Sequence, residues 1–142
     1  VVCTDMSERA LQLAQRSALD SGLRSVRFLR WDWNDPCPAA CEGARIILAA
    51  DLCYSEATAR LLLDALDRVA EDGCVVLVSF KIRSSSGLAA VRDFLSGARR
   101  LFRDCSPLLA PAAAVEVSAP DGGPMPLADR AVRATYLYRL RR

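Results

Sequence analysis

The sequence predicts an α/β fold with a mostly parallel sheet, helices on both faces and a C-terminal antiparallel hairpin. Short apolar runs alternate with longer segments whose apolar residues recur at helical spacing, a pattern typical of strand–helix repeats. The last two apolar runs have no helix between them, which indicates antiparallel neighbours. The length suits one domain, so we expect residues 1–142 to form a single, partial domain.

The N-terminal third predicts strand, helix and strand. An apolar run ends at Asp5, and Ser7 is a good helix N-cap because its hydroxyl can accept hydrogen bonds from free first-turn amides. Apolar residues then repeat at helical spacing until Gly22, which suits a helix C-terminus. Val26 begins a second strand, and the proline-containing segment 31–42 predicts a loop.

The middle of the chain begins with its most apolar run, Ala44 to Ala50. Such a run is typical of a strand covered on both faces. Ser55 is another candidate N-cap, and we expect its helix to end at Gly73. Cys74 to Phe80 predicts the next strand, and the apolar residues between Leu88 and Phe102 predict a third helix.

The C-terminal part predicts two strands without an intervening helix. Ala112 to Val117 and Ala134 to Leu140 are the two apolar runs, and Pro120 to Pro126 forms a Gly/Pro loop between them.

Composition excludes several kinds of site. The chain has no histidine, which excludes Ser-His-Asp and Cys-His nucleophile systems and argues against zinc. We expect the six cysteines to be free thiols in a reducing cytosol, with no metal site. A net charge of +2 gives no reason to expect a nucleic-acid or membrane partner, and no run is apolar enough to span a bilayer. We therefore expect a cytoplasmic protein.

Polar and aromatic side chains follow the predicted strands, where ligands bind in open α/β sheets. Asp5 closes the first strand, where it either accepts from the hydroxyls of a ribose or caps the following helix. Trp33 can pack on an adenine face while Asp32 accepts from the exocyclic amine. The alternative for a tryptophan is the core, and one of Trp31 and Trp33 can serve each purpose.

Two further segments follow the later strands. Asp51 and Tyr54 together can orient an amine or amide nucleophile; the alternatives are a helix cap for Asp51 and a half-buried ring for Tyr54. Lys81 and Arg83 follow the next strand, and we expect both to be solvated rather than to bind an acidic group.

These residues together resemble the seven-strand S-adenosylmethionine-dependent methyltransferases, and most closely the methyltransferase-like family 16 group of protein-lysine methyltransferases. Leu29 to Asn34 stands in place of the family's L-D-W-G, and Asp51-Leu52-Cys53-Tyr54 matches its D-x-x-Y motif. Val2 to Asp5 and Gly73 to Phe80 match two strands of the family, and the resemblance extends to about Phe102.

The resemblance implies a Rossmann-like fold, S-adenosylmethionine as cofactor, and N-methyl transfer to a lysine of a protein substrate. It implies that Asp5 holds the ribose hydroxyls and that Asp32 and Trp33 frame the adenine. Asp51 and Tyr54 would border the methyl-transfer site, with Asp51 also near the cofactor.

Two departures from the family matter. Asn34 often corresponds to glycine there, and the family's first strand and glycine-rich loop are missing from residues 1–142. In the family that strand lies between the strands that end here at Asp5 and Asp51. Each unsatisfied buried backbone group costs about 1–3 kcal/mol, against a net domain stability of roughly 5–15 kcal/mol. We therefore expect residues 1–142 alone to fold poorly and to be inactive, and the functional protein to be longer.

Two other functions fit parts of the pattern. A dinucleotide-dependent oxidoreductase shares the acidic residue at the strand end, but it predicts a catalytic Tyr-Lys or His pair that the sequence does not show. A non-catalytic binding module can keep the same fold, since fold alone does not set function. An intact glycine-rich loop would favour the enzyme over that module.

Overall fold

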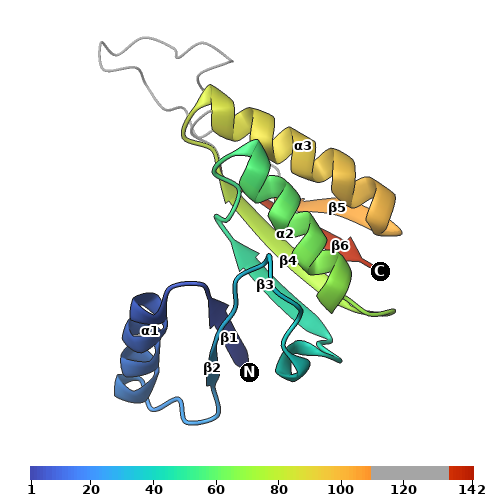
Figure 1. Ribbon diagram of the computed structural model, residues 1–142. Helices are drawn as coiled ribbons and strands as arrows, with labels where there is room; N and C mark the ends of the chain where they lie inside the picture. Colours follow the sequence, from blue (N-terminus) through green and yellow to red (C-terminus); the bar gives the residue numbers. More distant parts are fainter. Residues whose placement is uncertain (110–134) are drawn as a thin grey trace, which may run out of the picture. The chain divides into compact units, whose positions relative to one another are not determined.

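The computed structural model describes residues 1–109 and 135–142 (Figure 1). Its elements are β1 (Val2–Asp5), α1 (Glu8–Asp20), β2 (Arg27–Arg30), the 3-10 helix η1 (Ala39–Cys41), β3 (Ile46–Ala50), α2 (Glu56–Val69), β4 (Val75–Lys81), α3 (Ser85–Leu101), β5 (Asp104–Leu109) and β6 (Thr135–Arg141). The chain divides into two compact units, unit 1 (Val1–Glu42) and unit 2 (Gly43–Arg142). Among the described residues, no helix is long and apolar enough to cross a membrane.

Unit 1 is a β1–α1–β2 unit with the two strands parallel. Ser7 caps α1 as predicted, since its hydroxyl accepts from the Ala10 amide at 3.3 Å. Gly22 follows the last turn with a φ of 74°, and its amide donates to the Leu19 carbonyl at 2.9 Å. The left-handed conformation that glycine adopts readily therefore ends this helix, as the sequence predicts.

Unit 2 is a four-stranded sheet in the order β3-β4-β6-β5, with β3 and β4 parallel and β6 antiparallel to both neighbours. Helices α2 and α3 lie side by side over one face of this sheet (Figure 1). Phe80 of β4 and Phe94 of α3 meet edge to face, with ring centroids 5.3 Å apart. The largest fully buried side chains form this core: Phe80, Phe94, Leu140, Val76 and Val78. The predicted α/β class with antiparallel pairing near the C-terminus is confirmed.

The strand that pairs with β6 on the side away from β4 is β5, a segment that the sequence did not predict as a strand. The predicted strand Ala112–Val117 and the predicted loop Pro120–Pro126 lie outside the described residues. Pro107 within β5 argues against a strand, because proline lacks an amide to donate. At the end of the sheet order this loss is tolerated, since an edge strand pairs on one side only.

Helix α2 ends at Val69, earlier than the predicted end at Gly73. Gly73 instead supplies a positive φ of 84° in the turn before β4, where the Cys74 amide donates to the Glu71 carbonyl at 2.9 Å. The glycine therefore belongs to the helix–strand turn rather than to the helix C-terminus.

Within unit 2, the expectation that the most apolar strand is covered on both faces is wrong. Ala49 is buried, but Ile46 and Leu48 on the opposite face are 67% and 75% exposed. The reason is that α2 and α3 both cover the same face, and β3 is the edge strand of this sheet. Two large apolar side chains thus lie in solvent beside an edge of the sheet that unit 2 itself does not pair.

Residues 1–142 in isolation should self-associate through this edge, because exposed apolar edge strands template intermolecular pairing. We expect concentration-dependent light scattering, and we expect the double substitution Ile46→Lys, Leu48→Lys to reduce it strongly. The matched control is Leu13→Lys, Leu19→Lys, which removes two exposed leucines from α1 rather than from an edge strand. Equal scattering by both double variants would contradict the role given to β3.

Candidate functional site

Asp5, Asp32 and Trp33 lie at the carboxyl ends of the two strands of unit 1. Asp5 is paired with Arg30 in the parallel register, and the Trp31 amide donates to the Asp5 carbonyl at 3.0 Å. Both strands therefore end at one edge, as predicted, and their polar side chains follow at that edge. The binding roles of these residues stay predictions.

One oxygen of the Asp5 carboxylate supports the start of the following helix, which is the second of the two roles predicted for this residue. Its Oδ1 accepts from the Ser7 amide at 2.7 Å and so holds the start of α1. Its Oδ2 accepts no hydrogen bond from residues in the described ranges, and the side chain is exposed. One oxygen of Asp5 thus remains available for a ligand's hydroxyl group.

Asp32 is a fixed and ionised carboxylate. Its Oδ1 accepts from the Asn34 backbone amide at 3.0 Å and from the Asn34 side-chain amide at 2.9 Å, and these bonds hold its pKa below the ordinary value. Trp31 is buried in the core, with its indole Nε1 donating to the Asp35 carbonyl at 3.3 Å. Trp33 is only half-buried, so it is the tryptophan that can face a ligand.

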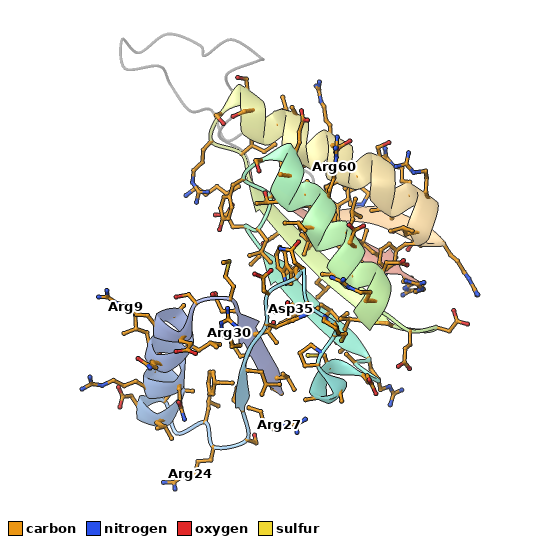
Figure 2. The ribbon with its side chains drawn as sticks, viewed as in Figure 1. Arg9, Arg24, Arg27, Arg30, Asp35 and Arg60 are labelled. Atoms are coloured by element: carbon orange, nitrogen blue, oxygen red, sulfur yellow. The ribbon has the colours of Figure 1, made fainter. Side chains whose placement is uncertain are left out.

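Arg30 stabilises the turn that follows β1, since its Nε donates to the Met6 carbonyl at 3.2 Å. Figure 2 marks this side chain together with Asp35 in the loop after β2. The other arginines that Figure 2 marks in unit 1 are exposed: Arg9, Arg24 and Arg27. Arg30 is thus a structural support of the turn that carries Asp5 and Ser7.

Asp51 ends β3 in unit 2 with an unusual backbone conformation. Its φ is +56°, a value rare for residues other than glycine and best tolerated by Asn and Asp. Its amide donates to the Ser79 carbonyl at 2.8 Å, so the β3–β4 ladder extends to this residue. Sparsely populated conformations of this kind cluster at functional sites, which supports Asp51 as a site residue.

The carboxylate of Asp51 is held by the last residue of β4 and by Arg83 just after it. Its Oδ1 accepts from the Lys81 amide at 3.3 Å, and its Oδ2 forms an ion pair with Arg83 Nη2 at 2.6 Å. Arg83 is the main cause that lowers the pKa of Asp51, which is therefore ionised at neutral pH. Arg83 is exposed, as expected, but it also pairs with Asp51, which was not predicted, because β3 and β4 are neighbours and bring the two residues together.

Arg83 is anchored on both sides along the chain. Ile82 is buried before it, and Ser84 after it caps α3 by accepting from the Gly87 amide at 3.1 Å. The guanidinium itself stays 56% exposed. The backbone at Arg83 is therefore fixed while its side chain reaches Asp51 from a solvated position.

Tyr54 completes this group. Its side chain is 62% exposed, so the half-buried alternative is wrong. Asp51 is the main cause that raises the pKa of Arg83, and the phenol of Tyr54 contributes to the same direction. Asp51, Tyr54 and Arg83, which we call the acceptor group, thus interact at the carboxyl end of β3. Sequence reasoning proposed the first two as site residues; it placed the third at a strand end but expected it to be solvated rather than to bind an acidic group.

Cys53 lies within the same motif, but it is no nucleophile. Burial, with Asp51 as a smaller cause, raises the pKa of its thiol to about 12. None of the six cysteines forms a disulfide, and no cluster of metal-ligating side chains occurs among the described residues.

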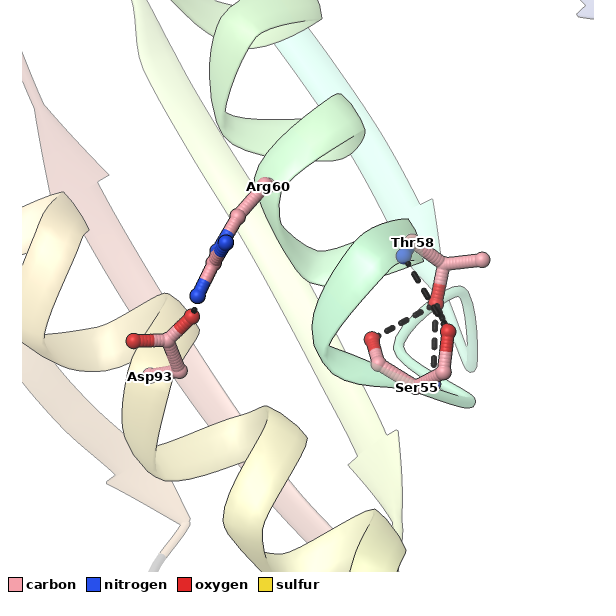
Figure 3. Close-up of polar contacts among 4 residues, drawn as sticks. All are labelled: Ser55, Thr58, Arg60 and Asp93. Carbon is pink, nitrogen blue, oxygen red and sulfur yellow. Dashed lines mark hydrogen bonds and ion pairs between the residues drawn. The ribbon is translucent and has the colours of Figure 1, made fainter.

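The start of α2 fixes the backbone beside Tyr54. Ser55 Oγ accepts from the Thr58 amide at 3.2 Å, and Thr58 Oγ1 accepts from the Ser55 amide at 2.9 Å, which forms a capping box (Figure 3). Thr58 Oγ1 also accepts from the Tyr54 amide at 3.1 Å. Ser55, not Asp51, is therefore the cap of this helix. Figure 3 also shows Arg60 paired with Asp93 at 3.5 Å, which links α2 to α3.

A protein-family model described as lysine methyltransferase matches residues 1–96, more than half of the chain. The chain belongs to the lysine methyltransferase family. The predicted family is thereby confirmed. The solved structures of S-adenosylmethionine-dependent methyltransferases that share the fold confirm the Rossmann-like fold class and, together with the family, S-adenosylmethionine as the cofactor. No curated protein sequence matches the chain.

Solved structures of the same fold include the S-adenosylmethionine-dependent methyltransferase SibL, with a TM-score of 0.61 and 21% identity. A TehB-like methyltransferase from Corynebacterium glutamicum has a TM-score of 0.61 and 16% identity. The chain is covered fully in both comparisons, but it spans only 43% of SibL and 67% of the TehB-like protein.

The [4+2]-cyclase SpnF shares the fold with a TM-score of 0.62 at 16% identity, over 99% of this chain and 65% of SpnF. The activity in the name of SpnF is a cyclisation, so the fold by itself does not determine the reaction.

Ser55→Ala should lower the free energy of unfolding by about 1 kcal/mol, because it leaves first-turn amides of α2 without their acceptor. Chemical denaturation of the protein that contains this chain measures the change. Ser96→Ala, at an exposed position inside α3, is the control and should be neutral or slightly stabilising. An equal loss in both variants would show that the capping box does not stabilise α2.

Proposed function

We propose that the protein containing this chain transfers a methyl group from S-adenosylmethionine to the side-chain amine of a protein lysine. The observation that carries the proposal is the acceptor group, in which an ionised carboxylate and an exposed phenol follow the most apolar strand. Membership of the lysine methyltransferase family supports the amine as acceptor.

The residues of unit 1 fit the cofactor by their hydrogen-bonding chemistry. Ribose hydroxyls and the adenine amine are donors, and each of Asp5 and Asp32 has one carboxylate oxygen without a hydrogen bond from the part of the chain that the structure describes. The half-buried Trp33 offers an aromatic face for the adenine. When bound, the cofactor supplies an electrophilic methyl group on a sulfonium sulfur.

Asp51 would bind and align the acceptor rather than remove its proton. A carboxylate with a lowered pKa is a weak base, and it favours the charged form of a nearby amine. Lysine has an ordinary pKa of about 10.4 and attacks only when neutral. The proton is therefore released to water, while Asp51 holds the amine in place and the Tyr54 hydroxyl restricts its orientation.

The cofactor assignment predicts that S-adenosylmethionine binds and that NADH does not, as measured by calorimetric titration of the protein that contains this chain. Asp5→Ala should weaken binding about 10- to 100-fold, because hydrogen bonds to a charged group are worth about 1.5–3 kcal/mol. Asp20→Ala, an exposed acid at the end of α1, is the control. Binding of neither ligand by a folded protein would favour a non-catalytic module.

The acceptor assignment predicts lower turnover for two variants, measured with radiolabelled methyl donor and a lysine-containing protein substrate. Asp51→Asn should lower kcat/KM about 10- to 100-fold, since it removes the charge that binds the ammonium. Tyr54→Phe should lower it about three- to tenfold, because it removes a neutral hydrogen bond. Asp64→Asn on the exposed face of α2 should change nothing. Unchanged turnover in the first two variants would remove both residues from the mechanism.

A further inference from the structure

We propose that Arg83 is the specificity-determining residue of the acceptor group: its guanidinium occupies the place on Asp51 that the acceptor ammonium takes, so the acceptor binds by displacing it. The inference rests on the proposed function, because it takes Asp51 as the binding group for the amine. It adds a residue that the sequence motif does not contain.

The two oxygens of Asp51 differ in how firmly they are held. Oδ1 faces the Lys81 backbone amide, which the β4 strand fixes in place. Among the described residues, the partner of Oδ2 is a side chain, the 56% exposed guanidinium of Arg83 at 2.6 Å. Exposed ion pairs are weak, because both partners are well solvated when apart. Oδ2 is therefore the oxygen at which one cation can replace another.

A cationic amine suits this exchange better than a neutral acceptor. The ammonium of lysine and the guanidinium of arginine both offer charged N–H donors to a carboxylate. A neutral amide or hydroxyl would have to replace a charge-assisted hydrogen bond with an uncharged one, which is about half as strong. Arg83 thus acts against neutral nucleophiles and selects amines that carry a charge when they bind.

The displaced Arg83 also determines which lysines bind well. Once the ammonium is on Asp51, the guanidinium, the Lys81 side chain and the acceptor place three positive charges near one carboxylate. A carboxylate next to the acceptor lysine in the substrate would pair with the released Arg83 and offset the excess positive charge. The acceptor is therefore a lysine with an acidic residue beside it in the substrate.

The test compares Arg83→Gln with the unchanged protein, using a lysine peptide flanked by Asp, one flanked by Ala, and one with norleucine in place of lysine. Arg83→Gln should tighten binding of the Ala-flanked peptide about two- to fivefold, the range expected for an exposed ion pair. The preference for the Asp-flanked peptide should fall by a similar factor. The norleucine peptide and the cofactor should bind unchanged.

Two control variants separate displacement from other effects. Arg83→Lys keeps a cation on Asp51 and should behave like the unchanged protein. Arg92→Gln removes the same charge from an exposed position of α3 and should leave peptide binding unaltered. Unchanged or weaker peptide binding in Arg83→Gln would overturn the inference, because Arg83 would then be a structural support or a partner that helps to bind the amine.

A second measurement keeps this test independent of turnover. Butylammonium is titrated while the carboxyl carbon signal of Asp51 is followed by nuclear magnetic resonance. Tighter butylammonium binding in Arg83→Gln, without methylation of any lysine peptide, would support competition at Asp51 and reject the proposed function. Equal butylammonium affinity in both proteins would overturn the inference, even if the protein methylates lysine.

Discussion

The parallel pairing of β3 with β4 is the constraint on which the acceptor group depends. The register from Ile46 opposite Val75 to Ala50 opposite Ser79 brings both strands to their carboxyl ends together. The Asp51 amide continues the ladder by donating to the Ser79 carbonyl. Because of this register, the backbone at Lys81 and the side chain of Arg83 meet the Asp51 carboxylate. A shift of one residue would turn these side chains to the other face.

Conformational strain and local stabilisation occur side by side at this edge of unit 2. Asp51 adopts a left-handed conformation that disfavours most side chains, and two hydrogen bonds, from the last residue of β4 and from Arg83, hold its carboxylate. The next turn is rigid, because Thr58 Oγ1 accepts from the amides of both Tyr54 and Ser55. The acceptor group is thus fixed through backbone contacts, while its functional side chains remain exposed.

Charge determines the chemistry that these residues support. The chain has no histidine, and the thiol beside the acceptor group has its pKa raised to about 12. Carboxylates remain, together with the phenol of Tyr54, and those of Asp32 and Asp51 are kept ionised by hydrogen bonds and by Arg83. Ionised carboxylates bind hydroxyl, amine and ammonium donors well and are poor proton acceptors. Such residues suit a reaction in which the cofactor provides the reactive group and the protein aligns the acceptor.

Local chemistry allowed much of this structure to be predicted from sequence. The hydroxyls of Ser7 and Ser55 cap the helices that they precede, because a cap involves only neighbouring amides. The order of strands and helices up to α3 and the D-x-x-Y motif are likewise readable, since spacing along the chain reports them. The sequence left open whether Asp5 binds a ligand or caps a helix, and which tryptophan lies in the core. Both depend on burial and on hydrogen-bond partners, which the three-dimensional structure determines.

The sequence by itself determined the family, the caps and the positions of the carboxylates at strand ends. Only the tertiary structure decided that Arg83 pairs with Asp51, that β5 includes Pro107, and that one face of β3 is exposed in unit 2. Each of these depends on which strands are neighbours and which face the helices cover. These contacts join residues far apart in the chain, so hydrophobic periodicity and residue spacing do not predict them.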